Sequence, residues 1–489
     1  MNPTHAPRLA ALALLFAATS QDALAADWPA GFSKCADEGG TCKVGTAARA
    51  VSFGIKNQFV VKTFAHDVPC DVATFGSDPA HGQVKKCAVG PIGKPPAPTP
   101  APTPVPVPPT PAPAPVPTPP SSDAARDVAP ASGGAGSAGG TSGGAKAAAA
   151  DVHEVSTASA LVAAVKASGN APRIIKVVGR IDLAAADNGG AFRSESDQAA
   201  RGELKLPSNT TLVGVGADAG LVNANVMIRK VDNVIVRNLT IVNPCDVAPK
   251  WDSSDGSSGN WNSQFDGITV DGAQHVWIDH DRFTDQPRTD DLSSSGHGKL
   301  VQCHDGAVDI KDAADYVTLS FNVFDHHDKN DLVGSSDSDT GDAGHLKVTF
   351  DHNWFSTITQ RTPRVRFGQV HLYDNLYTGS KADPVYPHAY SVGVGYEAKV
   401  RSEQNAFEIA GAGSCHDIVT NPGSSGKPGA IVDAGSTLNG APLSLAACAM
   451  SVDVGWTVPY DVRGALVPAS AVKALVEGQA GPGRIAVAR

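Results

Sequence analysis

One short pattern of apolar and polar positions recurs along the C-terminal part of the chain. Each copy is a β-rich run that ends in Asn or Asp, followed by one further residue and an aromatic residue. The copies occupy residues 276–283, 317–324, 348–355 and 370–377. A constant motif separated by loops of changing length is typical of a parallel β-helix, in which each coil adds strands to a stack. The pattern therefore predicts an all-β fold with parallel strands.

The Asn or Asp position is the most regular feature of this motif. It is occupied in turn by Asp281, Asn322, Asn353 and Asn375, at intervals of 41, 31 and 22 residues. We expect these side chains to form a column in which amides hydrogen-bond from coil to coil. The runs 173–178 and 211–216 fit earlier coils of the same stack. An antiparallel β-sandwich, the alternative all-β fold, does not explain one motif that repeats in phase.

Low-complexity sequence separates this region from a smaller N-terminal one. Residues 95–120 place Pro at nearly alternate positions, which predicts an extended polyproline II segment. Residues 121–150 are rich in Ser, Gly and Ala, and we expect them to be flexible. We therefore assign residues 91–150 to a linker and residues 151–489 to the β-helix domain.

The smaller region, residues 26–90, is rich in cysteine and aromatic residues. Its segments 50–54 and 58–64 have the composition of strands, so we predict a small β module stapled by disulfides. A sugar-binding module and a spacer without a ligand both fit this sequence. The aromatic residues are either sugar contacts or core, and the sequence leaves the two alternatives open.

Residues 1–25 have the features of a secretory signal peptide. Arg8 supplies a positive charge, residues 9–19 are apolar but too short to span a bilayer, and residues 23–25 (Ala-Leu-Ala) form a cleavage motif. We expect a secreted, extracellular protein without a membrane partner. The chain carries 39 Lys+Arg against 49 Asp+Glu, a net charge of -10, which argues against a nucleic-acid partner.

The eight cysteines divide into an early and a late group of four. The groups are Cys35, Cys42, Cys70 and Cys87, and Cys245, Cys303, Cys415 and Cys448. An even number in an exported chain favours disulfides, and three connectivities are possible within each group. In the late group we expect Cys415 to pair with Cys448, which leaves Cys245 for Cys303. A zinc ribbon is not predicted, because the sequence contains no C-x-x-C motif.

Carboxylates in the repeat region are candidates for binding a metal ion. Asp305 and Asp309 are four residues apart, and Asp266 lies on an earlier predicted coil. Oxygen donors from neighbouring coils suit a hard cation such as Ca²⁺.

A dense group of cations follows these carboxylates. The run 360–368 contains Arg361, Arg364 and Arg366, and Lys329 lies upstream of it. Cations combined with carboxylates indicate a site that holds an anionic substrate, with a metal ion bridging like charges.

The order of the motifs resembles that of the pectate lyases of polysaccharide lyase family 1. The resemblance is carried by Trp-Ile-Asp-His at 277–280, Asp-Gly-Ala-Val-Asp-Ile-Lys at 305–311 and Arg-Thr-Pro-Arg-Val-Arg at 361–366. It covers roughly residues 151 to 460. It implies a right-handed parallel β-helix and an enzyme that cleaves α-1,4-linked polygalacturonate by β-elimination, leaving 4,5-unsaturated products.

The resemblance also implies the calcium ligands. In the family, the positions that match Asp266, Asp305 and Asp309 bind the Ca²⁺ cofactor that bridges enzyme and uronate. Many members carry a further acid two residues before the first of these, where this chain has Gln264. We therefore expect weaker calcium binding when substrate is absent.

The cations receive roles from the same resemblance. Arg361 matches the arginine that takes the proton from C5, while Lys329 and Arg366 match the two cations that clamp the substrate. A guanidine acts as a base only where surrounding positive charge favours its neutral form. Arg364 is either a contact with a substrate subsite or a surface charge, and strand alternation places it on the same face as Arg366.

Three other functions fit the sequence less well. A pectin lyase acts on uncharged sugar and does not need the three aspartates. A polygalacturonase hydrolyses with acidic side chains, but its Asn-Thr-Asp and Arg-Ile-Lys elements are absent from the sequence, and we interpret 286–300 as a polar loop. A β-helical adhesin has no reason to align these cations with three acids. A monomer is the default expectation for the oligomeric state.

Overall fold

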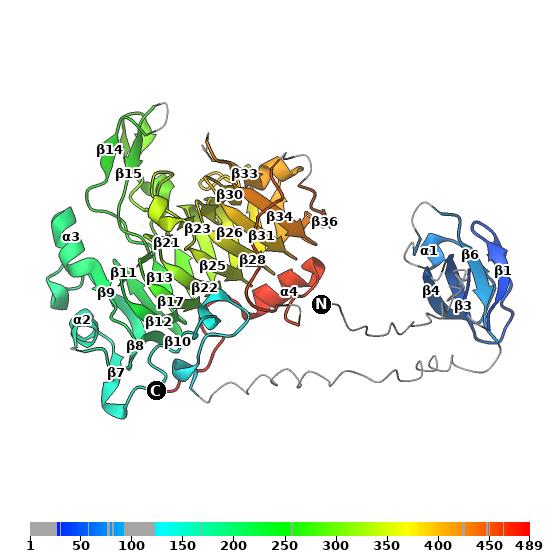
Figure 1. The fold of residues 1–489 in the computed structure, drawn as a ribbon, viewed down its shortest axis with the longest axis horizontal. Coiled ribbons are helices and arrows are strands. Elements are labelled where there is room, and N and C mark those ends of the chain that lie inside the picture. Colours follow the sequence, from blue (N-terminus) through cyan, green and yellow to red (C-terminus); the bar gives the residue numbers. More distant parts are fainter. Residues whose placement is uncertain are drawn as a thin grey trace, which may run out of the picture. The chain divides into compact units, whose positions relative to one another are not determined.

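The computed structural model describes residues 27–29, 31–56, 58–75, 79–80, 83–91, 123–167, 169–255, 258–422, 426–445, 448, 450–462 and 464–489. The chain divides into two compact units, Met1–Ala114 and Pro115–Arg489 (Figure 1). The predicted signal peptide and the Pro-rich tract 95–120 lie outside the described residues.

The first unit contains a four-stranded antiparallel sheet in the order β1-β6-β3-β4. Its elements are β1 (Ser33–Asp37), β2 (Thr41–Cys42), β3 (Arg49–Ile55), β4 (Gln58–Phe64), β5 (Val68–Pro69), α1 (Val72–Phe75) and β6 (Lys86–Val89). Disulfides join Cys35 to Cys42 and Cys70 to Cys87. Phe53 and Phe75 stack inside a small core, with ring centroids 5.1 Å apart. The predicted disulfide-stapled β module is confirmed, and these two aromatic residues belong to its core.

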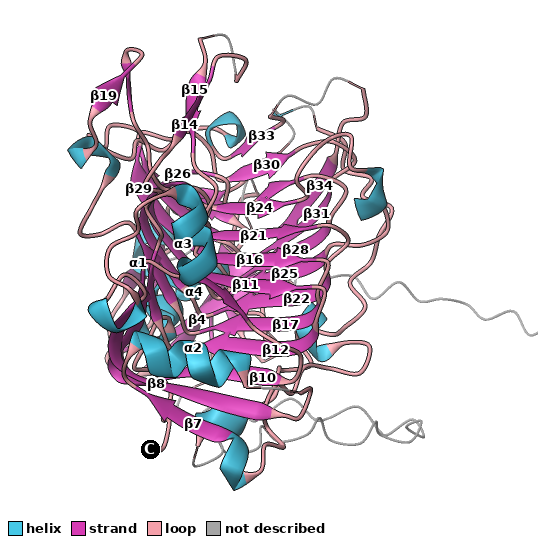
Figure 2. Cartoon of the chain, turned by 90° about the vertical axis from the view of Figure 1, so that its left-hand side faces the viewer, coloured by secondary structure: helices cyan, strands magenta, loops and turns pink. Residues whose placement is uncertain are grey.

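The second unit is a right-handed parallel β-helix, in which three sheets stack coil upon coil (Figure 2). The first sheet comprises β7 (Val152–Val155), β8 (Arg173–Asp182), β10 (Thr210–Val222), β12 (Asp232–Arg237), β17 (Gln274–Asp279), β22 (Asp315–Ser320), β25 (Lys347–Asp351), β28 (Gln369–Tyr373), β31 (Lys399–Glu403) and β34 (Ala430–Ala434). All neighbouring strands in it are parallel, as the repeated motif predicts.

The other two sheets complete each coil. The second comprises β13 (Thr240–Val242), β18 (Arg282–Thr284), β23 (Val323–Lys329), β26 (Trp354–Gln360), β29 (Leu376–Ser380), β32 (Ala406–Ala410) and β35 (Thr437–Leu438), with β36 (Ala441–Pro442) antiparallel to β35. The third comprises β9 (Glu203–Lys205), β11 (Asn225–Arg229), β16 (Ile268–Asp271), β21 (Val308–Lys311), β24 (Asp331–Val333), β27 (Arg364–Val365), β30 (Val392–Val394) and β33 (Val419–Thr420). Runs 173–178 and 211–216 lie in β8 and β10, as predicted.

Two columns of side chains hold successive coils together. The rings of Phe283, Phe324, Phe355, Tyr377 and Phe407 stack inside the β-helix with centroid distances from 4.3 to 5.0 Å. The second column consists of Asp281, Asn322, Asn353, Asn375 and Asn405. The side-chain oxygen of each Asn accepts from the backbone N–H of the column residue in the preceding coil, at 2.9–3.0 Å. Because each oxygen satisfies a backbone N–H at a turn, the column fixes the register of the coils. The predicted column is confirmed, and it extends to Asn405.

Residues 123–150 differ from the prediction of a flexible linker over 121–150. Their backbone packs on the first sheet: Gly134 N donates to Thr349 Oγ1 at 2.9 Å, and Gly144 N donates to Thr211 Oγ1 at 2.8 Å. A Cβ on Gly144 would lie only 1.9 Å from a backbone oxygen of β8. The small residues therefore permit a close approach to the sheet, and the β-helix unit begins before residue 151.

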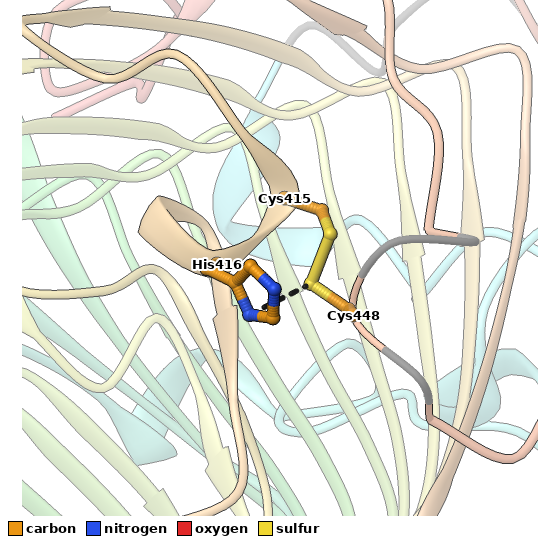
Figure 3. Close-up of side chains that lie close together, drawn as sticks. All are labelled: Cys415, His416 and Cys448. Carbon is orange, nitrogen blue, oxygen red and sulfur yellow. Dashed lines mark hydrogen bonds between the residues drawn. A yellow bond between two sulfur atoms is a disulfide. The ribbon is translucent and has the colours of Figure 1, made fainter.

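Helices and disulfides close the remaining edges of the unit. Helices α2 (Ala158–Lys166) and α4 (Ala469–Gln479) bury apolar residues against the stack, and α3 (Glu195–Gly202) precedes β9. The predicted pairs Cys245–Cys303 and Cys415–Cys448 are both present. His416 lies beside the latter, with Nδ1 3.7 Å from Cys448 Sγ, but the sulfurs are bonded to each other and offer no thiolate to a metal (Figure 3). Among the described helices, none has the length and apolar composition to cross a membrane.

Candidate active site

The predicted residues lie along the third sheet and in the turns that lead into it, on successive coils. Asp266 precedes β16 by two residues, and Asp309 lies in β21. Lys329 ends β23 of the second sheet, one residue before the connection to β24, and Arg364 lies in β27. Parallel pairing of β16, β21, β24 and β27 brings positions far apart in the sequence onto adjacent rungs.

Two of the predicted calcium ligands meet above a glycine. Asp266 is 2% exposed, and its two oxygens accept from Thr269 Oγ1 at 2.7 Å and Gly306 N at 3.1 Å. A Cβ on Gly306 would lie 2.4 Å from Asp309 Oδ1 and 3.0 Å from Asp266 Oδ1. The glycine in the Asp-Gly-Ala-Val-Asp motif therefore lets both carboxylates converge.

Carboxylates outnumber cations at this point of the fold. Burial, together with the charges of Asp309 and Asp305, raises the pKa of Asp266 well above its ordinary value. Burial raises the pKa of Asp309 to about 6, although Lys311 and Arg361 oppose this rise. The ammonium group of Lys311 lies 3.6 Å from Asp309 Oδ2. Such crowding of buried oxygen donors is relieved by a bound divalent cation, and the donor set fits Ca²⁺.

A fourth carboxylate, Asp246, lies beside the three that the sequence indicated. It is 7% exposed and accepts from Gln264 N at 2.8 Å. Burial raises its pKa to about 6, and the charge of Asp305 adds to this effect. The signal in the sequence was its neighbour Cys245, because the disulfide to Cys303 joins the two acidic segments. Many family members carry an acid at the position of Gln264. In this chain, Asp246 places an acid near that position.

Arg361 stands out among the cations. Its backbone is left-handed, with φ of 64°, and its Nε is buried without a hydrogen bond in the described part of the chain. The described residues also provide no carboxylate within ion-pair distance of Arg361 or of Lys329, which is 9% exposed. The charge of Arg361 acts on Asp309, and neither Arg361 nor Lys329 is neutralised by a described carboxylate.

The other two arginines are held differently. Arg366 Nε donates to Asp337 Oδ1 at 2.8 Å, and its Nη1 donates to the carbonyl of Gly334 at 3.0 Å. Arg364 is half-buried, and its Nη2 donates to the carbonyl of Pro422 at 3.0 Å. Burial, with the charges of Arg366 and Arg361, lowers the pKa of Arg364 to about 10. The three guanidinium groups therefore form one cationic cluster.

A buried network that the sequence did not indicate lies behind these residues. Asp285 accepts from His327 Nδ1 and Tyr386 Oη, each at 2.8 Å. Burial lowers the pKa of His327, but the charge and hydrogen bond of Asp285 outweigh this effect and the pKa rises to about 9. Asp285, Asp290 and His304 are close enough to suggest a metal site. However, both ring nitrogens of His304 already face carbonyl oxygens, at 3.1 and 2.9 Å. Both ring nitrogens of His304 are thus in contact with backbone carbonyls, and the hydrogen bonds of His327 and Tyr386 to Asp285 explain the network as buried ion pairing.

Part of this network lies in the segment that we interpreted as a polar loop. Residues 286–300 contain the short helical turn η5 (Asp290–Leu292) and the hairpin of β19 (Ser295–Gly296) and β20 (Lys299–Leu300). Asp290 is buried and not solvated. A second hairpin, of β14 (Lys250–Asp252) and β15 (Asn260–Asn262), leads to Asp266, and the two hairpins contact each other where Trp251 stacks on His297.

Comparison with known proteins identifies the family. The family model described as pectate lyase matches residues 121–485. The chain belongs to the pectate lyase family. Its sequence is 42% identical over 294 residues to the pectate lyase of Bacillus subtilis (strain 168). The aligned segment covers 60% of this chain and 68% of that protein. The predicted family, fold and enzyme class are thereby confirmed, and the protein is a pectate lyase.

Solved pectate lyase structures are similar over most of the second unit. One, bound to a hexasaccharide, has a TM-score of 0.70 and 36% sequence identity, and covers 74% of this chain and 100% of that chain. Another, described for substrate specificity and the anti β-elimination mechanism, has a TM-score of 0.70 and 35% identity, with the same coverage.

Proposed function

We propose that this pectate lyase cleaves α-1,4-linked polygalacturonate by calcium-dependent β-elimination, with Arg361 as the proton-abstracting base. The observation that carries the proposal is the position of Arg361. Its guanidinium makes no ion pair with a described residue, yet its charge acts on Asp309 in the adjacent acid cluster. The relative bound to a hexasaccharide and the relative described for β-elimination support this choice of substrate class and reaction.

Asp266, Asp305 and Asp309 would hold the calcium ion, with Asp246 adding negative charge nearby. When bound, Ca²⁺ would withdraw charge from the C6 carboxylate of a uronate and so acidify the neighbouring C5 proton. Three carboxylates that each offer one oxygen would fill three of the six to eight positions that Ca²⁺ prefers, which leaves room for substrate oxygens.

The cations orient the substrate and perform the proton transfer. Lys329 and Arg366 bind uronate carboxylates, and Arg364 extends the cationic surface. Arg361 takes the C5 proton, the C5 electron pair forms the C4–C5 double bond, and the C4–O bond breaks. The leaving oxygen then takes a proton from water. A guanidine acts in its neutral form where burial and neighbouring positive charge disfavour its cation, and both lower the pKa of the adjacent Arg364, burial more than the charges of Arg366 and Arg361.

Product analysis tests the proposed reaction. Elimination leaves a 4,5-unsaturated oligogalacturonide that absorbs ultraviolet light and takes no oxygen atom from water. Digestion of polygalacturonate in water labelled with oxygen-18, followed by mass spectrometry, should yield unlabelled, ultraviolet-absorbing fragments. Fragments that carry the label and do not absorb would mean hydrolysis and would refute the mechanism.

We further propose that the protein is secreted and acts as a monomer on plant cell-wall pectate. The predicted signal peptide and the four disulfides support export.

The proposed organisation is a signal peptide (1–25), an accessory module (26–90), a linker and the β-helix domain. N-terminal sequencing of protein from culture medium checks the cleavage after residue 25. Deletion of residues 26–120 checks the module: unchanged binding to insoluble cell wall would leave it as a spacer.

A further inference from the structure

A row of three polar side chains lies beside the proposed catalytic residues without belonging to them. Asp328 immediately precedes Lys329, and Gln360 immediately precedes Arg361. Gln302 follows the hairpin β19–β20 and lies three residues before Asp305. Each of the three is therefore attached by the backbone to a different part of the proposed site.

Hydrogen bonds connect the row at Asp328. Gln302 Nε2 donates to Asp328 Oδ2 at 2.9 Å, and Gln360 Nε2 donates to Asp328 Oδ1 at 3.0 Å. The residue after Asp328 is Lys329, which is paired in register with Gln360 across β23 and β26. One carboxylate thus joins two neighbouring coils to the loop that leads to Asp305.

Gln302 extends these hydrogen bonds toward Asp266, the calcium candidate on the earlier coil. Its Nε2 also donates to Asp290 Oδ2 at 3.1 Å, and its carbonyl accepts from Ser263 Oγ at 3.2 Å. Ser263 lies three residues before Asp266. The polar row therefore connects the segment that leads to β16 with the end of β26.

The choice of partners by Asp328 is informative. Asp328 and Lys329 are consecutive residues of β23, so their side chains point to opposite sides of the strand, and both oxygens of Asp328 accept from glutamine amides. Within the described residues Asp328 forms no ion pair, and neither Lys329 nor Arg361 has a carboxylate partner. The two amides hold the carboxylate in place, so that the adjacent cations stay available to an anionic substrate.

We propose that Asp328 is a positioning residue, which fixes Lys329 and Arg361 relative to the Asp305 loop through Gln302 and Gln360. This inference rests on the proposed function, because it concerns the geometry of that same reaction. It does not require Asp328 to touch the substrate. A misplacement of about 1 Å can cost about 100-fold in rate, which is the scale on which a positioning residue acts.

Exchange of donor and acceptor tests the role of Asp328. In Asp328→Asn, the negative charge is lost and one acceptor oxygen becomes an NH₂ donor, so one of the two glutamines has to turn its amide or lose its hydrogen bond, and both bonds lose their charge assistance. The double variant Asp328→Asn with Gln360→Glu restores both bonds, because the new amide donates to the new carboxylate while the remaining oxygen still accepts from Gln302. The matched control is Asp328→Asn with Gln302→Glu, which places a second carboxylate against Asp290.

The expected results separate positioning from general stability. Asp328→Asn should lower kcat about 10- to 100-fold while KM changes much less, and the Gln360→Glu exchange should recover most of the loss. The Gln302→Glu exchange should not recover it. Thermal unfolding midpoints of all variants are measured in parallel. Wild-type kcat in Asp328→Asn, or equal kcat in the two double variants, would overturn the inference.

A second measurement covers the case in which Asp328→Asn does not fold. Gln302→Ala, Gln360→Ala and their combination remove the amides singly and together. If Asp328 links them, the losses in kcat should be non-additive, and additive losses would contradict the inference. Wild-type protein without lyase activity would instead contradict the proposed function, so the two failures are distinguishable.

Discussion

The acidic and the cationic halves of the site are built in opposite ways. The carboxylates of Asp266, Asp309 and Asp246 are buried, and backbone or hydroxyl groups hold them close together. Among the cations, Lys329 is buried and the arginines are half-buried, and they differ in their partners: Arg366 has Asp337, while Arg361 has no ion-pair partner among the described residues.

This difference teaches which component each half lacks. Burial, with the like charges of neighbouring aspartates, raises the pKa values of Asp266 and Asp309, so the acidic half is completed by a divalent cation. The cationic half is completed by anions, of which a polyuronate supplies one per sugar. A substrate carboxylate shared between the halves satisfies both, and this explains how a chain with net charge -10 can act on an acidic polymer.

The largest effect is expected from the cationic half. Arg361→Lys keeps a positive charge but moves it and removes the guanidine, so kcat should fall about 10²- to 10⁴-fold, the usual contribution of general base catalysis. KM should change little. Steady-state kinetics on polygalacturonate measures this, with Arg229→Lys at the exposed end of β11 as the matched control. Near-normal turnover of Arg361→Lys would remove Arg361 from its proposed role.

Loss of one proposed ligand from the acidic half should weaken calcium binding but stabilise the calcium-free protein. Asp309→Asn removes a charge from the crowded cluster, so calcium affinity should drop about 100-fold. Without calcium the same variant should be more stable than the wild type, because a like-charge repulsion is gone. Calorimetric calcium titration and thermal unfolding in EDTA measure the two effects. Asp312→Asn, at an exposed position three residues after Asp309, is the control and should change neither calcium affinity nor stability in EDTA.

The pH dependence of this stability gain follows from the raised pKa. Asp309 has a pKa of about 6 in the folded protein against an ordinary value of 3.8. Its protonated form therefore stabilises the fold at low pH, and this stability is lost as the pH rises through about 6. The stability advantage of Asp309→Asn should grow by on the order of 3 kcal/mol between pH 4 and pH 7 without calcium. An advantage independent of pH, seen in denaturant titrations, would contradict the raised pKa.

A gain of charge sharpens the same comparison. Gln264→Asp adds a carboxylate next to Asp246 and Asp266, so calcium should bind about tenfold more tightly. The calcium-free protein should become less stable, since the repulsion increases. Gln274→Asp, the same chemical change at an exposed position of β17, should alter neither property. Unchanged calcium affinity in Gln264→Asp would show that position 264 does not face the ion.

The smallest effect is expected where the cationic half is already compensated. Asp337 is partly exposed and pairs with Arg366 at 2.8 Å. Asp337→Asn removes a competitor for the guanidinium, and KM for polygalacturonate should fall about twofold with kcat unchanged, in line with the low strength of exposed ion pairs. A higher KM would mean that Asp337 orients Arg366 for substrate.

The sequence predicted those features that repeat or that lie close along the chain. The motif that ends in Asn or Asp identified the coils, and its side chains form the expected column. The same motif occurs at residues 400–407, so Asn405 could have been included. Asp305 and Asp309 were recognisable because they share one short segment, and the late disulfides were recognisable by their number.

The features that the sequence did not reveal depend on contacts between distant segments. Composition suggested that residues 121–150 are flexible, but Gly and Ala are also what a backbone needs to lie flat on a sheet. Asp246 reaches the site from an earlier coil, and Asp285 and Asp290 become buried partners of His327 only in the folded chain. Spacing does not mark such groups in advance, and for Asp246 the one signal was its neighbour Cys245, whose disulfide partner Cys303 lies two residues before Asp305.

The central claim is that the two halves of the site work only when calcium and substrate join them. The most direct measurement is the initial rate of ultraviolet absorbance on polygalacturonate, with protein first stripped by EDTA and then titrated with CaCl₂. The account predicts no rate in EDTA and a saturable rise with calcium. A full rate that persists in excess EDTA would contradict it.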